Sequence, residues 1–234
     1  DGDGRIWVAS ANVHPTTGQA VGVVTQFAPD GEKLNTFNNV GMYNGNGLKG
    51  AIAVGDDGVV WVASPAEGRL TMFRPVTTGR DYAEGLGLLT SALAIDGGGD
   101  VWAVCTDRVV RFDGEGKTRE SHDLQAQAIA FDDEGNAWLT NSGRNVVTKL
   151  DAASGTQRDY DVGAGPSGVA IDGSRNVWVA NKADSTVTRV DSGGLSGEAK
   201  GPHAATRQHA SASPCRFNCI ALISSVRSTG GACG

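Results

Sequence analysis

Five tryptophans recur at intervals of 36 to 54 residues, and this repeat restricts the fold more than any other feature of the chain. Successive tryptophans are separated by 54, 41, 36 and 40 residues, and each follows a turn rich in Asp and Gly. They are Trp7, Trp61, Trp102, Trp138 and Trp178. A recurring period of about 40 residues is typical of four-stranded propeller blades. We therefore interpret the chain as a series of tandem units.

Each unit contains the patterns of four strands. A short run of alternating small and large apolar residues, such as Ala92-Leu93-Ala94-Ile95, predicts an innermost strand. The tryptophan then begins a second strand, and an alternating segment such as residues 146–151 predicts a third. A polar segment such as residues 156–160 suits a fourth strand at an edge that faces water. The runs interpreted as innermost strands are residues 51–54, 92–95, 128–131 and 169–171.

The sequence predicts an all-β fold, a β-propeller of four-stranded antiparallel blades with about five blades present in an incomplete ring. The 34 glycines favour short strands joined by tight turns, because glycine destabilises helix interiors. We expect one propeller domain over residues 1–202. Its blades are predicted at about residues 1–46, 47–88, 89–125, 126–164 and 165–202.

The repeat stops near residue 202. The phrase Gly165-Pro166-Ser167 recurs as Gly201-Pro202-His203, the expected entrance to a sixth blade. Residues 203–234 then contain no Asp, Glu, Trp or Tyr. We expect this segment to be a disordered tail that begins an unfinished blade. Open blade edges at both ends would favour self-association of the chain.

Charge and hydropathy exclude some partners. The formal net charge of −6 comes from dispersed Asp and Glu, so a nucleic-acid partner is not expected. No apolar run approaches the length of about 18 residues that a membrane span needs. The acidic turns, such as Asp1-Gly2-Asp3-Gly4, lack the ligand spacing of a calcium loop, and we interpret them as hairpin turns. Cys215 and Cys219 could hold zinc with His203 or His209, but unpaired thiols are preferred, and no metal site is predicted.

Strand alternation predicts a ligand-binding rim. The innermost strands begin, and the tryptophan strands end, at the same end of each blade, where ligand sites of propellers open. Ligand-binding residues are predicted there at Ser10, Ser64, Cys105, Asn141, Ser167 and Asn181. For Asn141 and Asn181 the alternative is that each caps the turn that follows it. Two long loops, residues 11–20 and 38–49, are a second candidate surface for a partner.

The phrase from Val169 to Asn181, VAIDGSRNVWVAN, resembles the repeats of bacterial NHL-type and streptogramin-lyase-like propellers. The resemblance covers about residues 1–205. It implies a bacterial protein, with an extracytoplasmic location as the expectation. Lyases of the virginiamycin B lyase kind open a macrocyclic lactone by elimination, with a histidine base and magnesium. The position of that histidine corresponds to Ser167 and His203 here.

Two functions follow from these expectations. The first is a non-catalytic propeller that binds a protein, a glycan or a small ligand at its rim, without a cofactor. The alternative is a streptogramin-lyase-like or lactonase-like enzyme, a carbon–oxygen lyase with magnesium, whose active site is incomplete in this chain. In that alternative His203 is the catalytic residue, because a histidine has a pKa suited to proton abstraction near neutral pH. The glutamate that often ends a tryptophan strand in that group is missing from all five strand ends.

Overall fold

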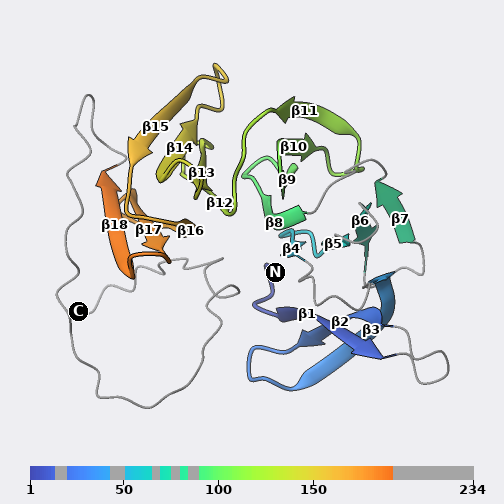
Figure 1. The fold of residues 1–234 in the computed structure, drawn as a ribbon. Helices are drawn as coiled ribbons and strands as arrows, with labels where there is room; N and C mark the ends of the chain where they lie inside the picture. The colour runs from blue at the N-terminus through green and yellow to red at the C-terminus, as the bar shows by residue number, and fades with distance from the viewer. Residues whose placement is uncertain (14–19, 43–50, 65–68, 75–79, 84–89, 192–234) are drawn as a thin grey trace, which may run out of the picture. The chain divides into compact units, whose positions relative to one another are not determined.

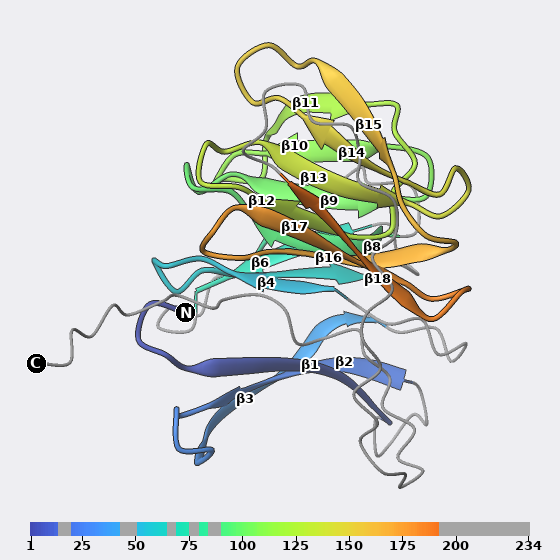
Figure 2. The ribbon, with the colours of Figure 1, turned by 90° about the vertical axis from the view of Figure 1, so that its left-hand side faces the viewer.

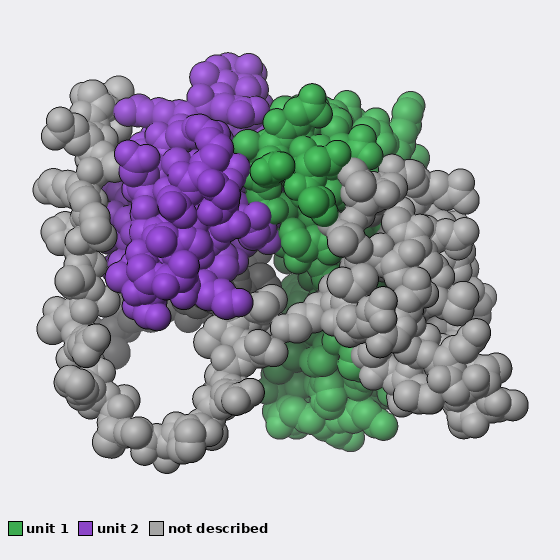
Figure 3. All heavy atoms as spheres, viewed as in Figure 1, with its two compact units in different colours: residues 1–126 green, residues 127–234 purple. Residues whose placement is uncertain are grey.

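A computed structural model describes residues 1–13, 20–42, 51–64, 69–74, 80–83 and 90–191. These residues form eighteen strands and no helix, so the all-β prediction is confirmed. The chain divides into two compact units, residues 1–126 and 127–234 (Figure 3). Of the two predicted long loops, residues 11–13, 20 and 38–42 belong to strands, whereas residues 14–19 and 43–49 lie outside the described residues. The predicted tail at 203–234 also lies outside them.

Unit 1 contains three antiparallel sheets, and each follows the chain order of its strands (Figure 1). The first sheet consists of β1 (Ile6–Val13), β2 (Ala20–Phe27) and β3 (Lys33–Met42), which lie side by side in Figure 2. The second consists of β4 (Ile52–Val54), β5 (Val60–Ser64), β6 (Arg69–Phe73) and β7 (Arg80–Ala83). The third consists of β8 (Thr90–Ile95), β9 (Val101–Cys105), β10 (Val109–Phe112) and β11 (Thr118–His122).

Unit 2 contains two further antiparallel sheets in the same order. The first consists of β12 (Ile129–Phe131), β13 (Ala137–Asn141), β14 (Val146–Leu150) and β15 (Gln157–Asp161). The second consists of β16 (Pro166–Ile171), β17 (Asn176–Asn181) and β18 (Thr186–Asp191). A fourth strand of this sheet would fall after residue 191, outside the described residues.

The strand order matches the blade pattern read from the sequence. The four apolar runs expected as innermost strands form β4, β8, β12 and β16, each at one edge of its sheet. Each of them pairs with the strand that carries the tryptophan, as in Ala130 opposite Trp138. The first sheet differs, because its first strand, β1, is already the tryptophan strand. It therefore has three strands.

Tryptophans pack between neighbouring sheets within each unit. In unit 1, Trp61 shares a cluster with Val101 and Ala103 of the next sheet. In unit 2, Trp138 shares a cluster with Val177 and Val179. A ring at one repeated position thus covers the two small residues that flank the next tryptophan, which is how stacked blades bury apolar area. Trp61 and Trp138 therefore pack between neighbouring sheets.

Trp178 is the exception among the tryptophans, since 41% of it is exposed. The sheet that carries it, β16–β18, is the last sheet in the described part of the chain. In the described ranges the structure also has no helix long and apolar enough to cross a bilayer.

Candidate functional site

A tryptophan and an aspartate six residues before it form a repeated hydrogen bond. The indole Nε1 donates to the carboxylate Oδ2 at 2.8 to 3.0 Å in four of the five repeats. The pairs are Trp7 with Asp1, Trp102 with Asp96, Trp138 with Asp132 and Trp178 with Asp172. The bond satisfies the indole donor beside an apolar interface, where an unpaired N–H would be costly.

The same carboxylate also closes the hairpin turn. In Asp132, for example, Oδ1 accepts the backbone N–H groups of Glu134 and Asn136 at 3.1 and 2.8 Å. The fourth turn residue has a positive φ, which glycine adopts without strain, as at Gly135 (φ 84°). The Asp residues of these turns therefore accept backbone N–H groups, and the Gly residues adopt the positive φ that the turn needs. In the described part of the chain, no group of three or more His, Cys, Asp or Glu residues is arranged to hold a metal ion.

These contacts shift the acidity of the turn carboxylates. Hydrogen bonds from Asn176 and then from Trp178 lower the pKa of Asp172 from 3.8 to about 2. For Asp132, burial acts to raise the pKa, but the hydrogen bonds from Trp138 and Asn136 outweigh it, so the pKa is lowered. Both groups are thus held as carboxylates, which suits hydrogen-bond acceptors and not proton donors.

The second repeat lacks this aspartate, because Gly55 occupies its position before Trp61. The turn itself is kept, since the Gly58 N–H donates to the Gly55 carbonyl at 3.0 Å. Asp57 takes over part of the capping role, and its Oδ1 accepts the Val59 N–H at 3.0 Å.

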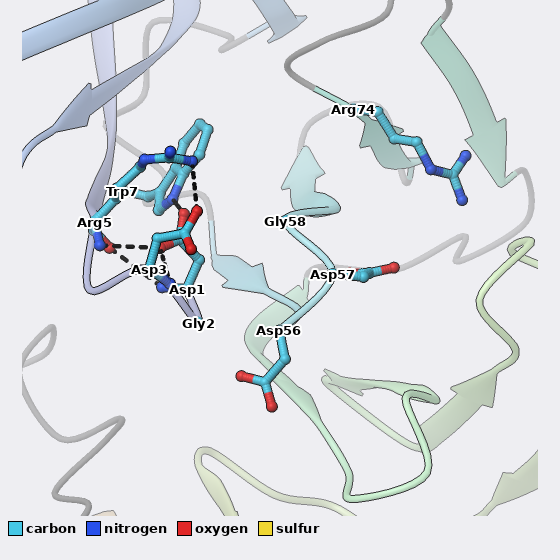
Figure 4. Close-up of a pocket in the computed structure, with 9 residues that line it drawn as sticks. All are labelled: Asp1, Gly2, Asp3, Arg5, Trp7, Asp56, Asp57, Gly58 and Arg74. Carbon is cyan, nitrogen blue, oxygen red and sulfur yellow. Dashed lines mark hydrogen bonds and ion pairs between the residues drawn. The ribbon is translucent and has the colours of Figure 1, made fainter.

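The hairpin turns of neighbouring sheets lie at the same end within each unit, which we call the turn end. In unit 2, Arg175 of one turn forms ion pairs with Asp133 (2.7 Å) and Glu134 (3.1 Å) of the preceding turn. In unit 1, a pocket of about 160 Å³ lies between the first two turns (Figure 4). Asp1, Gly2, Asp3, Arg5 and Trp7 line one side, and Asp56, Asp57, Gly58 and Arg74 complete it.

This pocket contains none of the residues predicted to bind a ligand. Its acidic side chains are already engaged in part, since Asp3 pairs with Arg5 at 3.0 Å and Asp1 accepts the Trp7 indole. Its volume is below the range of about 300 to 1,000 Å³ that small-molecule sites usually have. We do not assign a ligand to it.

The opposite end of each sheet, which we call the open end, carries the predicted rim residues. The strand registers place the start of the first strand beside the end of the tryptophan strand, with Thr90 opposite Cys105 and Pro166 opposite Asn181. The expected geometry of the individual blades is therefore present.

Two of the predicted ligand-binding residues, Ser10 and Ser167, are exposed. Ser167 lies near the start of β16, at the open end, whereas β1 continues past Ser10 to Val13, so Ser10 does not end its strand as predicted. The Ser167 hydroxyl donates to the Ala180 carbonyl at 3.4 Å, and the Ser10 hydroxyl donates to the Val23 carbonyl at 3.5 Å. Each hydroxyl oxygen keeps its lone pairs as acceptors. Both serines could therefore accept a hydrogen bond from a ligand.

The two predicted asparagines are buried, at 4% exposure for Asn141 and 2% for Asn181. Asn141 caps its turn, because its Oδ1 accepts the Arg144 N–H at 3.1 Å. Asn181 does not, and its amide instead donates to the hydroxyls of Thr186 (3.0 Å) and Thr188 (2.9 Å). The structure thus gives both asparagines partners within their own sheet.

Asn181 lies beneath the connection between β15 and β16. The Gly163 N–H donates to the Thr188 hydroxyl, and the Ala164 N–H donates to Asp184 at 2.7 Å. A Cβ at Gly163 would lie 2.5 Å from the Asn181 Nδ2, so a larger residue there would have to displace the Asn181 side chain. The connection covers Asn181 and keeps it from solvent.

Of the remaining predicted residues, one is too buried to contact a ligand and two are not described. Cys105 is fully buried, and burial raises the pKa of its thiol. A thiol in that state is a poor nucleophile. Ser64 ends β5, but its side chain is not described, and His203 lies outside the described residues.

Two open-end residues were missed by the sequence interpretation. Ser91, in β8, and Gln127, two residues before β12, occupy in their own repeats the position of Ser167. Ser91 is exposed, and its hydroxyl donates to the Val104 carbonyl at 3.2 Å, as Ser167 does to Ala180. The Gln127 Oε1 accepts the Ser142 N–H at 2.7 Å. Both residues could have been predicted from the sequence, because each precedes the turn aspartate of its repeat by five residues, as Ser167 does.

A charged cluster surrounds Trp102 in the third sheet. Arg111 forms ion pairs with Asp96 (3.0 Å), Asp100 (2.9 Å) and Glu120 (2.8 Å) and lies over the Trp102 ring. Burial acts to lower the pKa of Arg111, but the carboxylates outweigh it and raise the pKa. Arg119 also pairs with Asp100 at 3.0 Å, so the charged groups are engaged with one another, and we interpret the cluster as structural.

Comparisons with solved structures agree with the blade architecture. A streptogramin B lyase structure is 13% identical, with 82% of this chain and 71% of that chain covered and a TM-score of 0.63. A catalytically inactive variant of virginiamycin B lyase from Staphylococcus aureus, solved with quinupristin, is 14% identical over 82% and 72% of the two chains, with a TM-score of 0.61. A functionally unknown protein from Desulfotomaculum acetoxidans is 17% identical over 74% and 59%, with a TM-score of 0.59.

No protein-family model matches the sequence, and no curated protein matches it either. The structural likenesses nevertheless show the class of protein, which is an all-β protein of β-propeller fold. More particularly, the fold is that of a streptogramin-lyase-like propeller, as the resemblance in the repeats implied. At these identities the likeness concerns the fold alone.

Proposed function

We propose that this protein is a non-catalytic propeller that binds a ligand at the open ends of its blades. The observation that carries the proposal is the kind of side chain presented there. Ser91 and Ser167 are exposed neutral hydroxyls near the starts of β8 and β16, and Ser10 is an exposed hydroxyl within β1. Each is held by a carbonyl of its own sheet. Neutral donors and acceptors at fixed positions suit a ligand rich in hydroxyl or amide groups.

The residue types also weigh against proton-transfer chemistry at these positions. The resemblance implies a histidine base at the position of Ser167 and His203, and among the described repeats this position holds Ser91, Gln127 and Ser167. A serine hydroxyl or a carboxamide does not accept a proton near neutral pH without an activating base. We therefore favour binding of a glycan, a protein or a small polar molecule over catalysis.

A binding screen tests this proposal. The full chain is applied to a glycan array and to a peptide library, and the strongest ligand is then measured by titration. Ser91→Trp and Ser167→Trp, which block the open end, should weaken binding by about tenfold or more. Ser174→Trp is the matched control, because Ser174 is exposed in a hairpin turn at the turn end. Equal binding by all three variants would contradict the proposed surface.

The alternative function is an elimination reaction on a cyclic lactone, with magnesium as cofactor and His203 as base. It is motivated by the likeness to the solved lyases. This alternative predicts that the chain converts quinupristin in a magnesium-dependent way and that His203→Ala abolishes the conversion.

A further inference from the structure

One face of the last sheet, β16–β18, exposes apolar side chains. Trp178 and Val187 are 41% and 38% exposed. Trp178 pairs with Ala170, and Val187 pairs with Ala180, so all four lie on this face. The opposite face, with Val177 and Val179, is buried. We call the first surface the Trp178 face.

The counterpart of this face in the preceding sheet is buried. Ala130, Trp138 and Val147 hold the same register positions as Ala170, Trp178 and Val187. Trp138 and Val147 are both 0% exposed, because they pack on the next sheet. The same residue types thus have a partner sheet in one repeat, and in the next repeat they are left partly exposed.

The first sheet exposes the complementary surface. Ile6 and Val8 are 51% and 43% exposed, and they flank Trp7 as Val177 and Val179 flank Trp178. Strand alternation places them on the face opposite Trp7, whose own face packs against Val60 and Val62. We call this surface the Ile6 face. In the buried sheet pairs, a tryptophan packs on two apolar residues in the same positions, such as Val177 and Val179.

We propose that the Trp178 face of one copy of the chain binds the Ile6 face of a second copy. The supporting geometry is the sheet pairing already present within the chain, in which a tryptophan covers the two residues that flank the next tryptophan. The two surfaces differ, so the contact is heterologous and head-to-tail, and it can extend to further copies. This proposal is independent of the proposed ligand.

Sedimentation velocity over a range of protein concentrations tests the contact. Val187→Lys places a charge on the Trp178 face, and Val8→Lys places one on the Ile6 face. Both sites are exposed, so the folded state should tolerate either change, which circular dichroism checks. Val187→Asp and Val8→Asp serve as a second pair. Gln157→Lys, at an exposed site of β15, is the control for added charge.

The wild-type chain and the Gln157→Lys control should show a mass above that of one chain, and this mass should rise with concentration. Each face variant alone should associate at least about tenfold more weakly. An equal mixture of Val187→Lys and Val8→Lys should form a two-chain particle and nothing larger, because each variant keeps one working face. A wild-type chain that is monomeric at all concentrations would overturn the proposal. Association of Val8→Lys alone at wild-type strength would also overturn it.

Discussion

The indole Nε1 of Trp138 donates a 3.0 Å hydrogen bond to Oδ2 of Asp132, whose Oδ1 accepts the N–H of Asn136. One buried carboxylate therefore links the hairpin turn to the ring that packs against the next sheet. This link joins the geometry within a blade to the packing between blades.

Replacing Asp132 should destabilise unit 2. In Asp132→Ala the Trp138 indole and the Asn136 N–H lose their acceptor in a buried place, and we expect a loss of about 2 to 3 kcal/mol in the free energy of unfolding. Urea unfolding followed by tryptophan fluorescence measures it. Asp113→Ala is the matched control, because Asp113 accepts the same two kinds of turn N–H, from Glu115 and Lys117. An equal effect of the two substitutions would show that the indole bond adds nothing.

Acid should weaken the turns in a defined range of pH. The pKa of Asp172 is about 2 in the folded chain, below its ordinary value of 3.8. A lowered folded pKa means that the contribution is complete above the unfolded pKa and is lost as the pH falls through the folded pKa. Carboxyl titration by NMR should find this pKa, and the urea midpoint should fall between about pH 4 and pH 2. A value for Asp172 near 3.8 would contradict the hydrogen-bond geometry.

Two glycines with nearly the same backbone angle should respond differently to alanine. Gly165 (φ 65°) and Gly155 (φ 68°) both adopt the left-handed region. A Cβ at Gly165 would lie 2.8 Å from the Ala183 Cβ, whereas a Cβ at Gly155 would meet nothing within 4 Å. Gly165→Ala should therefore cost about 1 to 3 kcal/mol more than Gly155→Ala in urea unfolding. Equal costs would mean that the connection to β16 moves aside freely.

The second repeat offers a stabilising change. Gly55→Asp combined with Asp57→Gly restores the aspartate six residues before Trp61 and removes the carboxylate that would lie 2.5 Å from the new Cβ. We expect a gain of about 0.5 to 1.5 kcal/mol for the double variant. Gly55→Asp alone should gain less, because the steric contact stays. Differential scanning calorimetry compares the two, and a double variant less stable than the wild type would contradict the inferred equivalence of the repeats.

The spacing of residues predicted the sheets better than it predicted the site. Tryptophan spacing and apolar alternation sufficed for β4, β8, β12 and β16, because these signals are local. The six-residue spacing of aspartate and tryptophan is also visible in the sequence, but spacing alone does not distinguish an aspartate that only closes its turn from one that also bonds the indole. The burial of Asn181 could not be predicted, since it depends on Gly163 and Ala164 of a distant connection. Likewise, the exposure of Trp178 depends on which sheets are its neighbours.

The most direct test of the central claim is a turnover assay with quinupristin. The full chain is incubated with quinupristin and magnesium, and the products are separated by liquid chromatography with mass detection. The solved Staphylococcus aureus lyase in its active form is the positive control. Elimination opens the ring without a change in mass, and hydrolysis adds the mass of one water. Our account predicts that quinupristin is recovered unchanged, and magnesium-dependent ring opening that is lost in His203→Ala would contradict it.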